Sequence, residues 1–172
     1  MKPYFEELKI SQFFSAKISS IALDPQTTWQ DYFNFVATSI PTEYLFGDQF
    51  YHWLYKKHPY KAGLLKMDDK SIYNWHMDTN RGVCINCMLP TPNTSYTFFR
   101  LKYKPGVNIT QHKLIELQYY PGVRYLFNNQ QQHMVINYDG LRFMLTLEFE
   151  KNKNELSFEQ LSSEINELYY VR

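Results

Sequence analysis

The fold is decided by the stretch HMVINYDGLRFMLT, residues 133–146. Its central Asp-Gly dipeptide favours the tight turn of a β-hairpin and is flanked by two strand-like runs. In such a hairpin Asn137 lies opposite Arg142, and His133 lies opposite Thr146. Directly opposed residues share one face of a sheet, so we expect these four side chains to face a common cavity.

A second polar motif, WHMD at residues 75–78, lies upstream of this stretch. If residues 73–78 form a strand, His76 and Asp78 point to the same face, as joint binding of one ion requires. Two imidazoles and one carboxylate on neighbouring strands form the facial triad that binds non-haem Fe(II) and leaves coordination positions open. The sequence therefore predicts a metal site of His76, Asp78 and His133, although His76 alone would fit a hydrogen-bonded histidine at a strand end equally well.

Arg142 adds a cationic group to the same predicted face. Its guanidinium is a rigid fork that matches a carboxylate, and it lies about four strand residues, or about 13 Å between backbones, from the level of the metal ligands. A short diacid with one end on the metal and the other end on Arg142 would fill that gap. Taken alone, Arg142 could also be a surface or structural ion-pair residue.

These residues resemble a known family. The motif His76-Met77-Asp78, with His133 and with Arg142 nine positions after it, is similar to the Fe(II)/2-oxoglutarate-dependent dioxygenases, whose fold is a double-stranded β-helix of jelly-roll type. Arg142 followed four residues later by Thr146 is most similar to the prolyl-hydroxylase-like branch. The run YPGVRYLF at 120–127 resembles the turn and strand that precede the distal histidine there. The resemblance spans roughly residues 73–149.

The resemblance implies a ligand set and an activity. His76, Asp78 and His133 would bind Fe(II), while Arg142 and Thr146 would hold the distal carboxylate of 2-oxoglutarate. Oxidative decarboxylation of that cosubstrate would give succinate, carbon dioxide and an oxidant that hydroxylates a substrate. The substrate is expected to be a small molecule or a peptide, prolyl residues in a protein included.

The same family usually supplies a further polar contact to the cosubstrate. Tyr73, Asn86 and Tyr96 all lie in predicted strands of the core and are candidates for it. The sequence gives no ground for choosing among them, and we assign the contact to Asn86.

Three other interpretations are compatible with parts of the sequence. A cupin-like jelly roll that binds a metal or a small acid without oxidising anything would explain the triad, but not the pair Arg142 and Thr146. A zinc nucleobase deaminase is suggested by His76 with Cys84 and Cys87, but its signature needs His-x-Glu and Pro-Cys-x-x-Cys. A structural jelly roll of a virion or another assembly would leave the triad unexplained.

The whole chain is expected to form one α+β domain that is mainly β: a jelly roll braced by helices at both ends. Residues 1–66 would be a helical N-terminal support, residues 67–150 the jelly-roll core and residues 151–172 a C-terminal helix. The predicted strands are rich in aromatic and β-branched residues and span Ile72–Met77, Val83–Leu89, Tyr96–Tyr103, Leu114–Tyr120, Val123–Phe127, Met134–Tyr138 and Leu141–Phe149.

Three helices are predicted from apolar spacing and capping residues. The first runs from Trp29 to Ile40, where apolar residues recur at steps of four, three and four, and it ends at Pro41. The second follows Asp48 and turns Phe50, Trp53 and Leu54 inward. The third begins at the capping box of Ser157 and buries Leu161, Ile165 and Leu168.

Composition narrows the class of protein further. The 172 residues carry 18 basic and 17 acidic side chains, a formal charge of +1 without blocks of like charge, so no nucleic-acid or anionic-membrane partner is indicated. Two acids near the start and the absence of a long apolar window favour a soluble, cytoplasmic protein. Cys84 and Cys87 are the only cysteines, and we expect both to be reduced and structural. The oligomeric state is not predicted.

Overall fold

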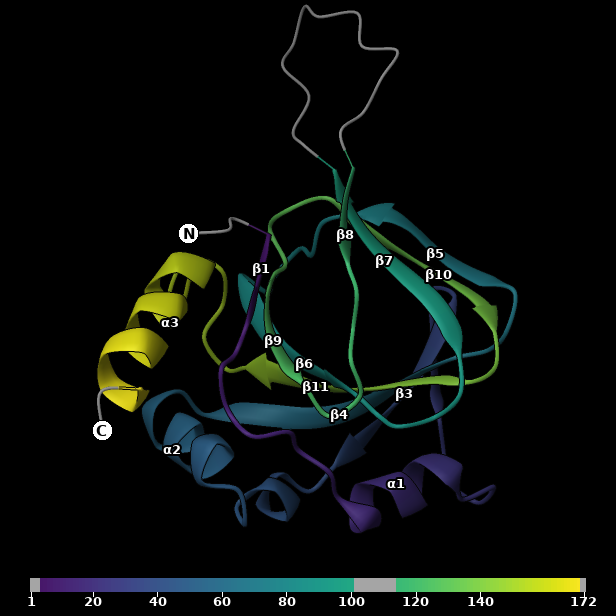
Figure 1. Cartoon of the computed structure of the whole chain (residues 1–172), viewed down its shortest axis with the longest axis horizontal. Coiled ribbons are helices and arrows are strands. Elements are labelled where there is room, and N and C mark those ends of the chain that lie inside the picture. The colour runs from purple at the N-terminus through teal and green to yellow at the C-terminus, as the bar shows by residue number, and fades with distance from the viewer. Residues whose placement is uncertain (1–3, 101–113, 171–172) are drawn as a thin grey trace, which may run out of the picture.

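The computed structural model describes residues 4–100 and 114–170. Its strands form two antiparallel sheets that pack face to face as a β-sandwich (Figure 1). The seven-stranded sheet consists, in spatial order, of β1 (Phe5–Glu7), β9 (Arg124–Asn128), β6 (Val83–Met88), β11 (Arg142–Phe149), β4 (Tyr60–Met67), β3 (Phe35–Ile40) and β2 (Gln30–Tyr32). The four-stranded sheet consists of β5 (Ser71–His76), β10 (His133–Asp139), β7 (Thr94–Arg100) and β8 (Leu114–Leu117). All seven predicted strands are therefore present, and residues 101–103 of the third lie outside the described residues.

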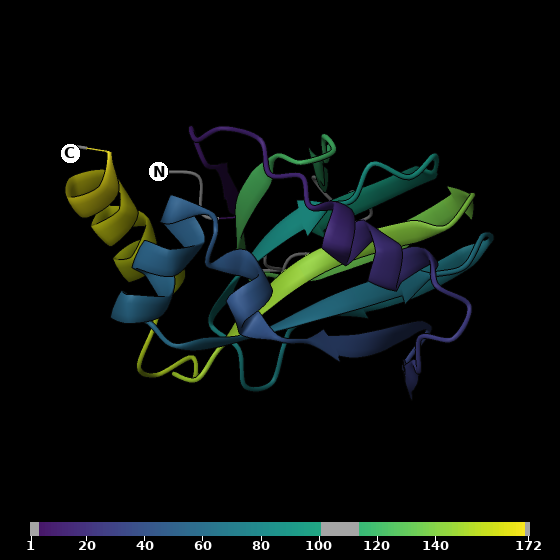
Figure 2. The same ribbon diagram turned by 90° about the horizontal axis from the view of Figure 1, so that it is seen from below.

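The helices cover the outer face of the seven-stranded sheet (Figures 1 and 2). They are α1 (Ala16–Leu23), the 3₁₀ helix η1 (Thr42–Leu45), α2 (Gln49–Lys57) and α3 (Phe158–Glu164), which continues as the π-helical turn η2 (Ile165–Tyr169). Within the described part of the chain, no helix is both long enough and apolar enough to cross a membrane.

Two of the predicted helices begin where their capping residues indicate. The Asp48 carboxylate accepts the backbone N–H of Tyr51 at 3.1 Å, and the Ser157 hydroxyl accepts that of Gln160, also at 3.1 Å. Each side chain satisfies a backbone donor that a helix leaves without a partner in its first turn. The predictions for α2 and α3 are therefore confirmed at their N-termini.

Strand β11 shows how one strand serves both sides of the large sheet. The side chains that pack under the helices are Phe143, Leu145, Leu147 and Phe149. The alternate side chains Arg142, Met144 and Thr146 line a cavity between the sheets. The period of two along a strand thus separates an apolar core from the polar site.

A second, smaller apolar cluster lies between the sheets and consists of Tyr4, Cys84, Phe99, Leu117, Tyr125 and Phe127.

The helix predicted from Trp29 to Ile40 is wrong, because this segment forms the hairpin of β2 and β3. Asn34 adopts the left-handed conformation with φ 62°, which reverses the chain, and Phe33 at the tip is 83% exposed. Strand β3 then pairs with β4. Apolar residues at 29, 33, 36 and 40 fit one helical face, but pairing with β4 decides the conformation.

Residues 1–66 are also less helical than predicted, since they contain β1 to β3 and most of β4 as well as two α-helices. Strand β4 pairs with β11 along its whole length, from Arg142 opposite Met67 to Phe149 opposite Tyr60. Its alternating buried residues Tyr60, Ala62 and Leu64 were not recognised in the sequence as a strand.

The predicted hairpin at Asp139-Gly140 is wrong in its pairing, since β10 and β11 belong to different sheets. Gly140, with φ 73°, reverses the chain, and a Cβ there would approach the Pro92 carbonyl oxygen to 2.3 Å. The Asn137 amide donates to backbone carbonyls of Met67, Asp68 and Gly140 at 3.2, 2.9 and 2.7 Å. Asn137 therefore holds the corner between the sheets and does not line the cavity that it was predicted to face.

Candidate functional site

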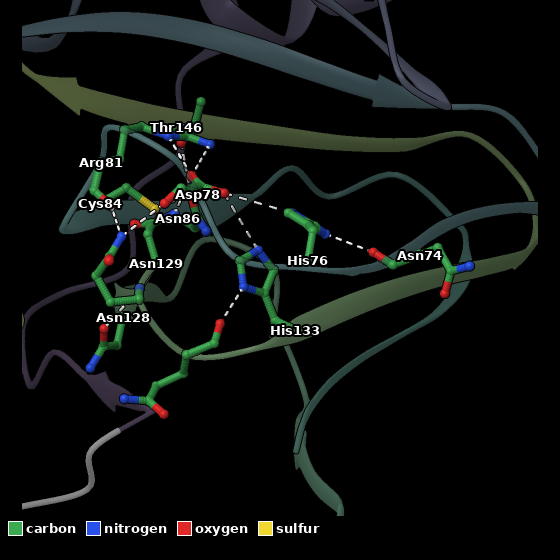
Figure 3. A network of polar contacts seen from close by, with 12 residues as sticks. Asn74, His76, Asp78, Arg81, Cys84, Asn86, Asn128, Asn129, His133 and Thr146 are labelled. Carbon is green, nitrogen blue, oxygen red and sulfur yellow. Dashed lines mark hydrogen bonds and ion pairs between the residues drawn. The ribbon is translucent and has the colours of Figure 1, made fainter. Parts of the chain in front are cut away.

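The three predicted metal ligands converge at one end of the small sheet (Figure 3). His76 is the last residue of β5 and His133 is the first of β10, and the two are opposite each other in the antiparallel pair. Asp78 lies just after β5, and its Oδ1 is 3.7 Å from His76 Nε2 and 3.9 Å from His133 Nε2. One ligand atom from each residue lies within 4.8 Å of the other two.

Backbone carbonyls orient both imidazoles. His76 Nδ1 donates to the Asn74 carbonyl at 2.7 Å, and His133 Nδ1 donates to the Gln131 carbonyl at 2.8 Å. Because a carbonyl oxygen only accepts, each Nδ1 carries a hydrogen, so in the neutral ring the lone pair is on Nε2. Both Nε2 atoms face Asp78. Metal-binding histidines commonly use this arrangement, in which the ring nitrogen away from the metal donates its hydrogen to a backbone carbonyl.

His133 is held in the neutral form that a metal requires. The pKa of His133 is lowered to about 4, mainly because the ring is buried and secondly because His76 lies next to it. The ring is 5% exposed and packs edge-on against Phe127, with 4.8 Å between centroids. At neutral pH its Nε2 is therefore available as a ligand.

The other oxygen of Asp78 is bound by two residues that were not predicted. Arg81 contributes Nε and Nη2, each 2.6 Å from Oδ2, and Asn129 contributes Nδ2 at 2.8 Å. Figure 3 shows Arg81 and Asn129 beside the triad. An arginine three residues after the acid is a weak sequence signal, and Asn129 reaches the site only through tertiary folding.

Arg142 lines the same cavity as the two histidines of the triad, His76 and His133. The cavity lies between the two sheets, and its empty volume is about 590 Å³ when the open mouth is included. Arg142 is 5% exposed, and among the described residues it has no acidic partner; its Nε has no hydrogen-bond partner either. Burial lowers the pKa of Arg142. A buried cation without a counter-ion favours an anion in this cavity.

Thr146 and Asn86 are neighbours on paired strands, as β11 places Thr146 opposite Asn86 of β6. The Thr146 hydroxyl donates to Asn86 Oδ1 at 2.8 Å, and Asn86 Nδ2 donates to the Tyr119 hydroxyl oxygen at 3.2 Å. All three residues line the cavity. The structure thus places both predicted residues in the cavity that Arg142 lines and links them to Tyr119 in one polar chain.

Tyr119 is a cavity residue that the sequence did not reveal. The guanidinium carbon of Arg142 lies 5.6 Å from the centre of its ring. Burial raises the pKa of Tyr119, so its hydroxyl stays protonated, and the described residues offer no acceptor for that hydrogen. Tyr119 therefore presents a donor next to Arg142. Its only sequence signal was a place at the end of a predicted strand.

The two tyrosines that were considered with Asn86 lie in different places. Tyr73 lines the cavity and packs on the His76 ring, with 3.9 Å between centroids. Tyr96 is 37% exposed and contacts Phe98 and Tyr138 outside the cavity. Tyr96 is therefore excluded as a contact to a ligand beside the triad.

Both cysteines are free and buried, as predicted. Cys84 belongs to the cluster between the sheets and Cys87 to the core under the helices, so they lie on opposite faces of β6. Burial raises the pKa of the Cys84 thiol to about 11 and that of the Cys87 thiol to about 12. They cannot bind one zinc ion together, as the deaminase interpretation requires.

Comparison with known proteins finds similarity at the level of structure only. No model of a known protein family matches the sequence, and neither does any curated protein. A prolyl-4-hydroxylase from Pseudomonas putida is 12% identical, with a TM-score of 0.62 over 87% of this chain and 94% of that chain. A 2OG-Fe(II) oxygenase family oxidoreductase from Burkholderia pseudomallei is 12% identical, with a TM-score of 0.57 over 84% and 80%.

A third structure is the viral collagen prolyl hydroxylase from Paramecium Bursaria Chlorella virus-1, solved as a 2OG complex. It is 11% identical, with a TM-score of 0.57 over 87% of this chain and 97% of that chain. The TM-scores indicate a common architecture, but sequence identities this low do not transfer an activity. The chain has the fold of these oxygenases.

Proposed function

We propose that the protein is an Fe(II)- and 2-oxoglutarate-dependent dioxygenase that hydroxylates a small molecule or a peptide. The observation that carries the proposal is the position of Arg142, a buried guanidinium without an acidic partner among the described residues. It lines the same cavity as His76 and His133, which converge with Asp78. A metal-storage protein needs the triad but has no use for a buried cation beside it.

The donor set of the triad fits Fe(II). Two neutral imidazoles and one carboxylate oxygen are the ligands of the facial site used by non-haem Fe(II) oxygenases, and the remaining positions stay open. Both Nε2 atoms and Asp78 Oδ1 already face one another in the geometry described above. With Fe(II) and 2-oxoglutarate bound, the site would supply the oxidising chemistry.

The cavity also fits the far carboxylate of 2-oxoglutarate. Arg142 would pair with it, and the hydroxyl hydrogen of Tyr119 would supply a further donor. Asn86 Nδ2 donates to the Tyr119 oxygen, which directs that hydroxyl hydrogen away from Asn86. In this proposal Thr146 and Asn86 orient Tyr119, and the tyrosine makes the contact that we assigned to Asn86 from the sequence.

The exposed side of the triad indicates where the oxidised substrate would enter. The His76 side chain is 20% exposed, whereas that of His133 is 6% exposed. Tyr73 and Phe35 line the cavity on the His76 side, and the centroids of their rings lie 5.1 Å apart. Substrate would therefore approach past these two rings.

Release of succinate in air tests the proposed reaction. Purified protein with Fe(II), ascorbate and 2-oxoglutarate should form succinate slowly even without its substrate. The variants His133→Ala and Asp78→Ala should lose this activity, and His52→Ala is the matched control, because His52 is exposed and packs on Phe46 outside the cavity. Binding of Fe(II) and 2-oxoglutarate without succinate would instead favour a non-oxidative cupin-like protein.

A further inference from the structure

The Arg81–Asp78 pair differs from an ordinary arginine–carboxylate pair. In the common fork arrangement, two guanidinium nitrogens each bind a different carboxylate oxygen. Here Nε and Nη2 of Arg81 both bind Oδ2 at 2.6 Å, and Asn129 Nδ2 adds a third donor to the same oxygen at 2.8 Å. Among the described residues no hydrogen bond reaches Oδ1, which faces the two imidazoles.

The backbone around this pair is also fixed. The Asp78 N–H donates to the Asn129 carbonyl at 3.0 Å. Gln130 Nε2 donates to the carbonyls of Asp78 and Arg81 at 2.9 and 2.8 Å. These bonds join the segment after β5 to the turn before β10, so the carboxylate cannot rotate without breaking contacts on both segments.

We propose that Arg81 and Asn129 are positioning residues that keep Asp78 a one-oxygen metal ligand. This inference rests on the proposed function, because it concerns the metal that the triad would hold. Oδ2 is occupied by three donors, so only Oδ1 is free to coordinate. A carboxylate without such partners can bind a divalent cation through both oxygens.

The consequence is an open coordination position. A six-coordinate ion held by three protein atoms keeps three positions for other ligands. A chelating keto acid would take two of them and leave one for a further reactant. If Asp78 bound through both oxygens, that last position would be lost. Arg81 and Asn129 would thus control reactivity without touching cosubstrate or substrate.

The number of open positions can be measured with Mn²⁺ alone. Water exchanging on protein-bound Mn²⁺ enhances the relaxation of bulk water protons in proportion to the number of bound waters. The wild-type protein should keep three waters, and Arg81→Met/Asn129→Ala should keep two, which lowers the enhancement per bound ion by about one third. Arg81→Lys, which retains a cationic donor to Oδ2, should restore most of the wild-type value.

Arg81→Met alone removes two of the three donors and gives the same test if the double variant fails to fold; its enhancement should fall in the same direction. Arg100→Met is the matched control. Arg100 is also partly buried and donates to Gln132, the residue before His133, but it does not contact the triad. A variant lacking the Oδ2 donors that binds Mn²⁺ with the wild-type enhancement would overturn the proposal.

A kinetic measurement separates positioning from simple support of the fold. In succinate release, the double variant should lose kcat while its KM for 2-oxoglutarate stays within about two-fold, because Arg142 is untouched. Wild-type protein that holds Mn²⁺ with three waters but forms no succinate would refute the proposed reaction and leave the role of Arg81 standing. Wild-type protein that does not bind Mn²⁺ would overturn both.

Discussion

The two faces of β11 contrast a region built for stability with a region built for binding. On the helix side, Phe143, Leu145 and Leu147 are each no more than 1% exposed and contact other apolar side chains. On the cavity side, Arg142 and Thr146 are 5% and 6% exposed, and Arg142 has no acidic partner among the described residues. Residues adjacent in sequence therefore have opposite roles, and the free energy of unfolding and the affinity for a ligand should respond to different members of the same strand.

The largest effect should come from the helix side. Leu147→Ala removes a fully buried side chain and leaves a cavity, so it should lower the free energy of unfolding by about 2–5 kcal/mol. Urea denaturation of the metal-free protein measures this, with metal affinity of the folded fraction unchanged. A loss below about 1 kcal/mol would mean that this face is not the stabilising core.

The second-largest effect should come from the cavity side, where a substitution should lower the affinity for 2-oxoglutarate and not the free energy of unfolding. Arg142→Met should weaken 2-oxoglutarate binding by about 1.5–3 kcal/mol, or about 10–150-fold, since charge-assisted hydrogen bonds are lost. The free energy of unfolding should stay the same or rise, because the substitution removes a buried charge without a counter-ion. Calorimetric titration and urea denaturation test the two parts. Unchanged affinity for 2-oxoglutarate would remove Arg142 from the binding site.

The triad end of the cavity should make stability depend on pH. The folded pKa of His133 is about 4, below the unfolded value of about 6.5, so between these values the unfolded chain binds more protons. Without metal, the free energy of unfolding should therefore fall by on the order of 1–3 kcal/mol as pH drops from about 6.5 to 4. His133→Phe should lack this component. Equal pH profiles for the two proteins would contradict the burial of a neutral imidazole.

The smallest effect should come from Thr146. Thr146→Val removes the hydroxyl that donates to Asn86 and loosens the polar chain to Tyr119. Affinity for 2-oxoglutarate should fall by about 0.5–1.5 kcal/mol, or about 2–12-fold, while the free energy of unfolding changes by less than about 1 kcal/mol. An effect on binding as large as that of Arg142→Met would mean that Thr146 contacts the ligand directly.

The sequence predicted the members of the site better than the pairing that assembles them. His133, Arg142 and Thr146 do face one cavity, although the hairpin that was used to argue this does not exist. The prediction survives because alternate residues of β10 and β11 point inward from two facing sheets as well as from one. Asn137 shows the limit of the argument, since its amide holds the corner instead.

Other parts of the structure depend on contacts that no local pattern records. The segment of β2 and β3 has apolar spacing compatible with a helix, and only its pairing with β4 makes it a hairpin. Asn129 and Tyr119 reach the site across 51 and 33 residues of sequence, to Asp78 and Asn86. Sequence spacing identified the candidate ligands His76, Asp78 and His133, but not the residues that contact them or line the cavity, such as Asn129 and Tyr119.

We propose that Fe(II) binds at the triad and that 2-oxoglutarate binds between that metal and Arg142. Anaerobic addition of 2-oxoglutarate to the Fe(II)-loaded protein, followed by visible absorption, tests it most directly. The wild-type protein should show a weak charge-transfer band that saturates at one 2-oxoglutarate per protein. The band should be absent in Asp78→Ala, and in Arg142→Met it should saturate only at a higher concentration of 2-oxoglutarate. If wild-type protein that has bound Fe(II) shows no such band, 2-oxoglutarate does not chelate the metal at this site.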